Sequence, residues 1–562
     1  MRMKTKNHNH HHHKAPIIQS SIFQFTTTLM EPMKKLNLKN PTLLDSLDDS
    51  ISKFLDRQIS PSINPTLVLS ENDAPVDELP PTQCPTTTGG PLPPCLDGLY
   101  IRTGPNPQFL PTSPYYVLDG DGMLHSTRIS AGRATFCSRY VHTHKHDVER
   151  RAGRPVVPNF FGLCRGRLLA AVARLTVLTA RVLSGQFDPK NHGFGPANTN
   201  VALLGGRLFA MCESDLPYEV GVTEDGDVKT LGRYNFGNED DEPFQNMTAH
   251  PKVDRETGDV FAYRYDFARP FLTFYRIEGG EKKRKGVPIG SARGCTIAHD
   301  FALTGSHAVL VETQIAVNPW WVLGGRPPVR VVPGKSPRLG IIGKYAEDDR
   351  DMVWVDSPGF NPLHFANAWE EEGGRGIVEM VATNITQVEH ILDDIARAGL
   401  KLEKVTVDIE TGQVTRRTMS TRFLDLAVVN PAYETKKNRY VYAGEIGSTA
   451  VVGVVKLDLS LMDDEKCEDC TVASRQYGPG CYGSEPFFVA REPDNPAAEE
   501  DDGYLVTYMH DENIKESKFL VMDAKSPTLD IVAAVRLPQR VPNGFHGVFV
   551  PENDLMKVKI NN

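Results

Sequence analysis

The sequence predicts an all-β fold, a β-propeller, from residue 97 to the C-terminus. Short strand-like runs alternate with tight turns through about 450 residues, and long helices are few. Many of the turns place an acidic residue and a glycine between two such runs, which is a hairpin signal. Hairpins are expected at 128–141, 223–234, 254–266, 275–287 and 408–419. Their number favours a propeller over a sandwich.

The first 40 residues are expected to be a transit peptide or a disordered tail. Residues 1–30 contain no Asp or Glu, several Lys and Arg, and the Ser/Thr-containing stretch SSIFQFTTT. Such a composition fits an organelle-targeting segment. The histidine run at 8–13 is interpreted as a low-complexity tract or a tag, outside the fold.

Residues 41–96 are expected to form an amphipathic helix followed by a proline-rich extended strap. Leu44, Leu47 and Ile51 fall on one helical face, and acidic residues occupy the other. The helix either packs on the protein's own core or is an arm that touches a membrane or a partner.

A second helix is expected at 165–184, where the sequence contains no acidic residue. Its arginines recur every seven residues and so form one stripe of the helix. A basic helix with a wide apolar face can lie in a membrane interface, although an ordinary helix of the propeller's cap is the alternative. The predicted docking residues are Leu168, Leu169, Val172, Arg174, Trp320 and Trp321.

Composition excludes several classes of partner. The net charge is −9, which argues against nucleic acid, since phosphate binding needs a basic surface. No stretch of about 18 apolar residues is present to span a membrane. The nine scattered cysteines suit a reducing compartment, and Cys467 and Cys470 are interpreted as exposed loop thiols rather than a metal site.

Histidines are the candidate metal ligands, because a neutral imidazole offers a lone pair near pH 7. His142, His144 and His146 form an H-x-H-x-H pattern, interpreted as a polar strand edge. His250, His299, His364 and His546 are far apart in the sequence but share small or apolar neighbours. From the residues alone, the interpretation of each as an ordinary core histidine is favoured over that of a metal ligand.

Ten separated motifs, in order, connect the chain to a known family. They are LSENDAPVDELPPT (69–82), GLYIRTGPNPQFLP (98–111), LDGDGMLH (118–125), ESDLPYE (213–219), NMTAHPKVD (246–254), TIAHDFALT (296–304), NPLHFANAWE (361–370), NPAYETKKNRYVYAG (430–444), EPFFVARE (485–492) and FHGVFVPE (545–552). With these motifs the chain resembles the carotenoid cleavage dioxygenases of plants, most of all their fourth, plastid subfamily.

The resemblance implies a seven-bladed propeller with a helical cap over an Fe²⁺ ion. The implied iron ligands are His250, His299, His364 and His546, with O₂ as co-substrate. Three carboxylates would orient the ligand rings: Glu213, Glu485 and, where glutamate is expected, the shorter Asp425.

The implied reaction is cleavage of one polyene double bond of a carotenoid or apocarotenoid, at the 9,10 or the 7,8 position, giving aldehydes or ketones. The implied location is a plastid, peripheral on the thylakoid or on plastoglobules. Two alternatives stay open: a polyene isomerase on the same scaffold, and a propeller that binds apolar ligands without catalysis.

Overall fold

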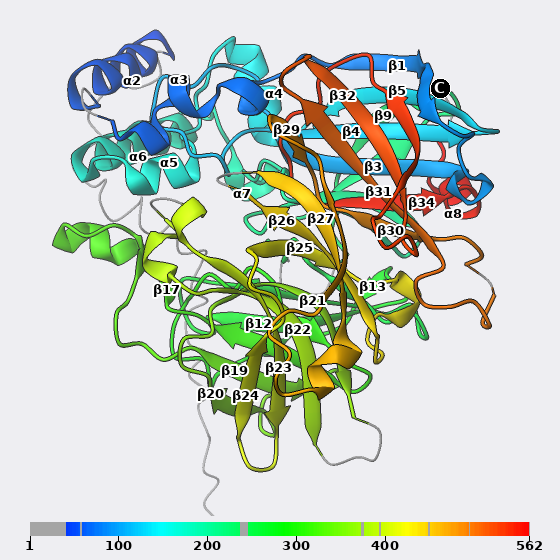
Figure 1. Cartoon of the computed structure of the whole chain (residues 1–562). Helices are drawn as coiled ribbons and strands as arrows, with labels where there is room; N and C mark the ends of the chain where they lie inside the picture. The colour runs from blue at the N-terminus through cyan, green and yellow to red at the C-terminus, as the bar shows by residue number, and fades with distance from the viewer. Residues whose placement is uncertain are drawn as a thin grey trace, which may run out of the picture.

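The computed structural model describes residues 41–56, 59–236, 245–371, 376–392, 395–447, 450–493 and 495–560 (Figure 1). The predicted transit segment therefore lies outside the described residues. Strands dominate the described chain and form seven sheets. The all-β prediction is confirmed at this level, whereas a seven-bladed propeller stays a prediction because no sheet closes on itself.

Five sheets contain four or five strands each. In spatial order, the sheet at the two ends of the described chain contains β1 (Leu79–Cys84), β5 (Arg133–Tyr140), β4 (Gly122–Ser130), β3 (Gly98–Pro105) and β34 (Gly547–Pro551). The next contains β6 (Asn200–Leu204), β7 (Arg207–Met211), β8 (Tyr218–Val222) and β9 (Val228–Arg233). The third contains β10 (Lys252–Val253), β11 (Val260–Tyr265), β12 (Leu272–Glu278) and β13 (Lys282–Lys283), with β14 (Val287–Pro288) also on β12. The fourth contains β15 (Ala302–Leu303), β16 (His307–Glu312), β19 (Arg338–Gly343) and β20 (Val353–Asp356), and the fifth contains β21 (Pro362–Glu370), β22 (Ile377–Ile385), β23 (Leu400–Asp408) and β24 (Val414–Thr418).

The other two sheets differ in size. The two-stranded sheet contains β17 (Ile315–Val317) and β18 (Val329–Val331). The ten-stranded sheet contains β2 (Thr86–Gly89), β33 (Ile531–Arg536), β32 (Glu516–Asp523), β31 (Gly503–Asp511), β29 (Cys481–Gly483), β27 (Val451–Asp458), β26 (Tyr440–Ile446) and β25 (Leu424–Val428), with β28 (Thr471–Gln476) on β27 and β30 (Phe487–Ala490) on β31.

The predicted hairpins are confirmed, because the turn chemistry is local. All five turns join antiparallel neighbours: β4 to β5, β8 to β9, β10 to β11, β12 to β13, and β23 to β24. In the first of them Ala131 and Gly132 occupy the two-residue turn with φ of 49° and 72°. A positive φ at both positions matches the right-handed twist of the flanking strands.

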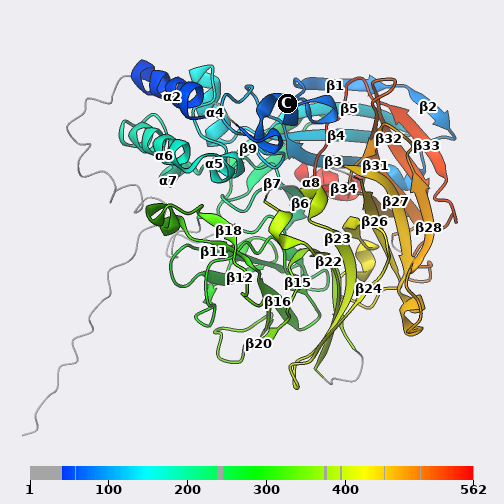
Figure 2. The ribbon, with the colours of Figure 1, turned by 60° about the vertical axis from the view of Figure 1, so that its left-hand side comes forward.

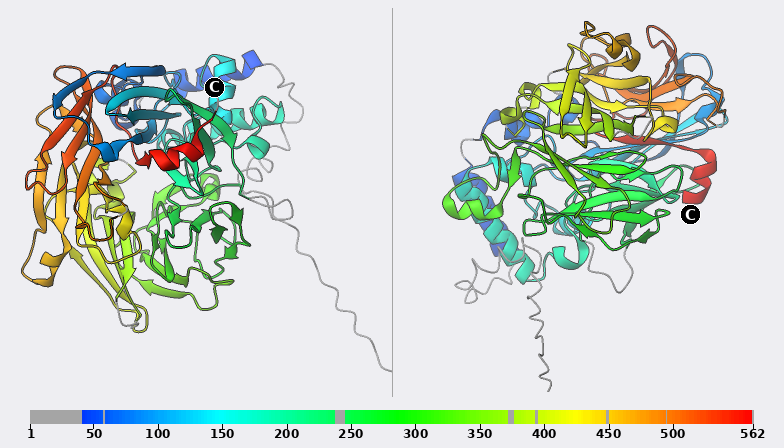
Figure 3. Two further views of the ribbon diagram at one scale, coloured as in Figure 1. Left: turned by 90° about the vertical axis from the view of Figure 1, so that its right-hand side faces the viewer. Right: turned by 90° about the horizontal axis from the view of Figure 1, so that it is seen from below.

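The sheet made of β1, β5, β4, β3 and β34 joins the two ends of the described chain. β3 pairs with β34 from Gly98 opposite Pro551 to Arg102 opposite Gly547. In Figure 3 the blue strands accordingly lie beside the red C-terminal segment, which ends in α8 (Glu552–Val558). The main apolar core lies between neighbouring sheets; its largest cluster joins side chains of β11, β12, β16, β19, β22 and β23.

Helices gather on one side of the sheets (Figures 1 and 2). They are α2 (Pro41–Leu55), α3 (Pro65–Val68), α4 (His144–Ala152), α5 (Phe160–Arg165), α6 (Leu168–Leu183) and α7 (Pro189–His192). Leu44 and Ile51 of α2 pack against Ala170, Val177 and Ala180 of α6. The amphipathic helix therefore covers the protein's own core rather than extending as an arm.

The arginine stripe of α6 faces α2, and the prediction that Arg174 docks at a membrane is wrong. Arg174 is 4% exposed and forms an ion pair with Asp56 of the α2 segment. Arg181 Nη2 lies 2.8 Å from Asp45 Oδ1. The acidic face of one helix thus neutralises the basic stripe of the other, which leaves these arginines no headgroup to bind.

The interpretation of the H-x-H-x-H stretch as a strand edge is also wrong. β5 ends at Tyr140, and Thr143 caps α4 by accepting a hydrogen bond from the backbone N–H of His146. The cap and the acidic Asp147 in the first turn favour a helix start. Within the described part of the chain, no helix is long and apolar enough to cross a membrane.

Candidate metal centre

Four histidine rings that are far apart in sequence meet at one point. One ring nitrogen from each of His250, His299, His364 and His546 lies within 4.8 Å of the others. The Nε2 atoms of His250 and His299 are 3.0 Å apart. Ring centroids are 4.6 Å apart between His250 and His546, and 4.8 Å between His364 and His546. These spacings place four imidazole nitrogens around a common centre.

Each ring is carried at or near the end of a strand. His250 comes two residues before β10, and His299 three residues before β15. His364 is the third residue of β21, with a register shift on either side of it, and His546 directly precedes β34. The starts of strands from different sheets thereby converge, and at His364 the irregular backbone helps to aim the ring.

Three carboxylates contact the outer nitrogens of three rings. Glu213 Oε1 lies 2.5 Å from His299 Nδ1, and Glu485 Oε1 lies 2.8 Å from His546 Nδ1. Glu485 also accepts a hydrogen bond from the backbone N–H of Gly547 at 3.0 Å. An acceptor at Nδ1 fixes the tautomer that leaves the Nε2 lone pair free, so these rings present Nε2 to the centre.

Asp425 makes the same contact although it is one methylene shorter than glutamate. Its Oδ1 lies 2.8 Å from His364 Nδ1, so the contact is direct and needs no bridging water. The pairing of β25 with β26 shifts register after Asp425, and Leu426 takes a φ of 52°. A backbone bulge beside Asp425 therefore accompanies the shorter side chain.

Replacing Asp425 with alanine is expected to lower the affinity of the four-histidine centre for a metal ion such as Fe²⁺ by about 10- to 100-fold, because His364 loses the acceptor that orients it. Iron retained against a chelator measures this directly. Glu445→Ala is the matched control, since Glu445 lies on the neighbouring strand and pairs with Arg422 away from the centre. Unchanged iron retention in the Asp425 variant would contradict the orienting role.

Burial and charge set the protonation of the centre. Burial, followed by the neighbouring His299, holds the pKa of His250 well below its usual value. Burial also outweighs Asp425 and lowers the pKa of His364. For His299, burial opposes protonation, but the Glu213 carboxylate prevails and raises the pKa. His250 and His364 are therefore neutral at pH 7 and keep the lone pair that a metal requires.

The residues fit a divalent metal ion. His364 Nε2 is buried and has no hydrogen-bond partner among the described residues. A buried polar atom without a partner is costly, and an ion at the centre would satisfy it. Four imidazoles suit Fe²⁺, and with four neutral protein ligands an octahedral ion keeps open positions.

An ion pair that was not predicted from the sequence connects three of the segments that carry the histidines. Asp300 is 2% exposed. Its Oδ1 lies 2.8 Å from Lys252 Nζ, and its Oδ2 accepts a hydrogen bond of 2.8 Å from the backbone N–H of Phe365. Lys252 follows His250 by two residues. Asp300 directly follows His299, and Phe365 directly follows His364. The pair therefore connects three histidine-bearing segments. Its sequence signal was present in H-P-K and A-H-D, where a charge adjoins each histidine.

The residues predicted to dock at a membrane lie near one another on the helical side. Leu169 is 67% exposed and Trp320, in the 3-10 helix Pro319–Gly324, is 39% exposed. Leu168, Val172 and Trp321 are half-buried. A β-carbon built on Gly325 would lie 4.0 Å from Leu168, so the two segments adjoin.

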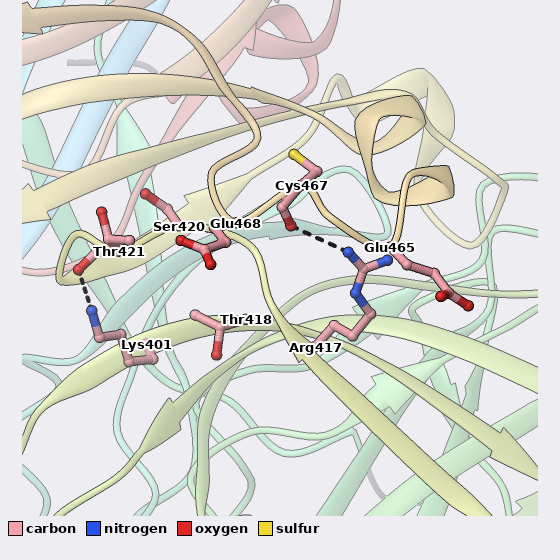
Figure 4. A pocket seen from close by; sticks show the side chains of 8 residues that line it. All are labelled: Lys401, Arg417, Thr418, Ser420, Thr421, Glu465, Cys467 and Glu468. Atoms are coloured by element: carbon pink, nitrogen blue, oxygen red, sulfur yellow. Dashed lines mark hydrogen bonds between the residues drawn. The ribbon is translucent and has the colours of Figure 1, made fainter.

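The Cys467–Cys470 pair lies apart from the histidines. Both cysteines lie in a loop, as predicted, but the interpretation that they are exposed is wrong. Cys470 is buried and Cys467 half-buried, with their sulfurs 3.8 Å apart. Cys467 borders a pocket of about 460 Å³ that Lys401, Arg417 and Ser420 also line (Figure 4). None of its lining residues is one of the four histidines.

Comparison with known proteins agrees with the site. The family model RPE65, described as retinal pigment epithelial membrane protein, matches residues 73–551. The chain belongs to this family, the RPE65 and carotenoid cleavage dioxygenase family, and its members named below are enzymes.

Among individual relatives, the chain is 53% identical over 522 residues to "Probable carotenoid cleavage dioxygenase 4, chloroplastic" of Arabidopsis thaliana, covering 92% of this chain and 86% of that protein. It is 42% identical over 375 residues to "Zeaxanthin 7,8(7',8')-cleavage dioxygenase, chromoplastic" of Crocus sativus, covering 66% of this chain and 99% of that protein. Both names support a plastid location.

Among solved structures, the lignostilbene dioxygenase of Pseudomonas brassicacearum matches with a TM-score of 0.72 at 20% identity, covering 88% of this chain and all of that one. This likeness supports the fold alone.

Proposed function

We propose that the protein is an Fe²⁺-dependent dioxygenase that cleaves one double bond of a carotenoid or apocarotenoid. The observation that carries the proposal is the convergence of four histidine rings, three of them each held by a carboxylate. Bound ferrous iron would supply the activation of O₂. The ligands are His250, His299, His364 and His546.

The protein's own part is positioning rather than acid–base chemistry. Glu213, Asp425 and Glu485 hold three rings by their outer nitrogens and balance the charge of a divalent ion. Their carboxylates are buried or nearly so, and burial strengthens these interactions. Four fixed rings leave the ion's remaining positions for O₂ and solvent.

An apolar substrate fits the surroundings of the centre. One apolar cluster contains Ile297 and Leu363, which precede His299 and His364, and reaches Cys164 on α5 of the helical side. The cluster offers apolar contacts from the helices to the metal ligands. A long polyene can be held this way without hydrogen bonds, with one bond placed near the ion.

Product mass tests the reaction and its position. Incubation of the iron-loaded protein with β-carotene, zeaxanthin and an apocarotenal is expected to give shorter carbonyl products, cut at the 9,10 or the 7,8 bond. A product of unchanged mass would instead indicate polyene isomerisation. Purified protein without stoichiometric iron and without turnover would indicate an apolar-ligand-binding module.

We also propose that the exposed apolar residues of α6 and Trp320 dock on a plastid membrane or plastoglobule surface, through which the substrate arrives. Leu168, Leu169 and Val172 stand at the start of α6, beside the segment that carries Trp320 and Trp321. Aromatic and aliphatic side chains gathered on one face suit the boundary of a lipid layer.

Changing Leu168, Leu169 and Val172 to polar residues is expected to weaken vesicle binding by at least about tenfold, since each buried leucine contributes about 1.5–3 kcal/mol. Co-flotation with phosphatidylcholine vesicles measures binding, and iron content is expected to be unchanged. Leu461→Gln with Ile514→Gln is the matched control, because both residues are exposed elsewhere. Co-flotation equal to that of the parent would show that the helix only caps the fold.

The sheets support a seven-bladed arrangement as part of the proposal. Dividing the ten-stranded sheet at β29 gives one group of β25 to β28 and another of β2 and β30 to β33. Together with the five sheets of four or five strands these make seven groups, each the size of a propeller blade; β29 and the two-stranded sheet fall outside them.

A further inference from the structure

A second group of side chains that could bind a metal ion lies between the end of β5 and the first turn of α4. His142, between the strand and the helix cap, faces His146 and Asp147 of the first helical turn. One ligand atom from each of the three lies within 4.8 Å of the others. His144 takes no part, because its Nε2 accepts the backbone N–H of Asp188 at 3.1 Å.

The distances are close to those of a tetrahedral site. Asp147 Oδ1 lies 3.6 Å from His142 Nδ1 and 3.4 Å from His146 Nδ1. Ligands about 2.0–2.1 Å from a tetrahedral ion are about 3.3–3.4 Å from one another. The Asp147 oxygen is therefore within a few tenths of an ångström of tetrahedral ligand spacing from both nitrogens. The two imidazole rings have centroids 4.9 Å apart.

The charge and exposure of the group suit a cation. His146 is 2% exposed, and its Nδ1 lies 3.4 Å from the Asp147 carboxylate. Among the described residues, Asp147 forms ion pairs with the two imidazoles, and no lysine or arginine lies within ion-pair distance of its carboxylate. The side chains of His142 and Asp147 are 43% and 42% exposed, which leaves a fourth position open to water.

The backbone around the group is fixed independently of any ion. His142 N–H donates to Thr230 Oγ1 at 3.0 Å, and the N–H of Asp147 donates to the Thr143 carbonyl at 3.0 Å. On the other side of the helix, Lys145 Nζ lies 2.7 Å from Asp121 and 2.8 Å from Glu149, all three buried. Because these contacts already order the segment, binding would cost little rearrangement.

We propose that His142, His146 and Asp147 bind a divalent ion of the zinc class at a site separate from the four-histidine centre. Two imidazoles and one carboxylate are ligands that Zn²⁺ and Co²⁺ accept. The ion joins the end of β5 to the first turn of α4, where the chain leaves the sheet for the helices. It therefore stabilises the attachment of the helical side.

The test uses the full-length chain with His8 and His10 to His13 changed to alanine, so that this run cannot bind the probe. The protein is first loaded anaerobically with Fe²⁺, then titrated with Zn²⁺ by calorimetry and with Co²⁺ by visible absorption. One further ion per chain, the absorption of tetrahedral Co²⁺ and a higher Tm with Zn²⁺ are expected. His142→Ala and Asp147→Asn are expected to weaken binding at least about tenfold, with iron content unchanged.

His192→Ala is the matched control, because this exposed histidine lies 5.0 Å from the His144 ring, centroid to centroid, but outside the group. It is expected to bind Zn²⁺ as the parent does. Circular dichroism and iron content verify that each variant is folded. The proposal is overturned if the parent takes up no second ion, if the His142 and Asp147 variants bind as tightly as the parent, or if the His192 variant loses as much affinity.

Discussion

His364→Ala is expected to abolish iron retention and cleavage together. The substitution removes one of four nitrogens from the centre and leaves the 5% exposed Asp425 carboxylate without the ring that it contacts. Iron per chain by mass spectrometry and apocarotenoid products by chromatography give the two readouts. Turnover is expected to fall by at least about 1,000-fold, because the ion that the proposed reaction needs to activate O₂ is lost.

His307→Ala provides the matched control for that change. His307 Nδ1 pairs with Glu370 at 2.9 Å, which reproduces a histidine–carboxylate pair outside the centre. Its loss is expected to leave iron and turnover at the parent's level. A His364 variant that retains iron and product formation would remove His364 from the ligand set.

Asp300→Ala is expected to lower the free energy of unfolding by about 2–4 kcal/mol, since it leaves Lys252 unpaired and strips acceptors from two buried backbone N–H groups. Iron retention should fall as well, because Lys252, Phe365 and Asp300 adjoin three of the ligands. Denaturant unfolding of the iron-free protein separates the loss of stability from the loss of metal.

Arg255→Ala is the matched control for Asp300. Arg255, in the turn that follows β10, forms an ion pair with Glu434 at 2.8 Å, and these two side chains are 52% and 40% exposed. An exposed pair contributes about 0–1 kcal/mol. Equal effects from the two substitutions would show that the Asp300 pair is an ordinary surface contact.

A structural feature could be predicted from the sequence where a few adjacent residues determine it. The hairpin at Ala131 and Gly132 was predictable, because two adjacent residues determine the turn. The four histidines share only ordinary surroundings, so the motifs around them were needed to select them. Their meeting depends on the arrangement of separate sheets, which no short segment specifies.

Two predictions on the helical side were wrong: that Arg174 docks at a membrane, and that residues 142–146 form a strand edge. The first failed because of a tertiary contact, and the second because a local signal was overlooked. Arg174 could be assigned to a membrane only while the acidic face of residues 45–56 was considered separately. The two helices carry opposite charges on one face each, and the structure pairs those faces. The helix start at Thr143 had a local signal, a threonine cap with an acid in the first turn, which the histidine spacing obscured.

The pairing of β3 with β34 also bears on when the centre can form during synthesis. His546 is held between Thr103 and β34, whose last residue is Pro551. The three other histidines are synthesised earlier than His546, so the metal site lacks one ligand until the remaining strands have been made. The centre has all four ligands only once residue 546 has been made, and a chain that stops before it would lack one ligand and leave the edge of β3 without its β34 partner.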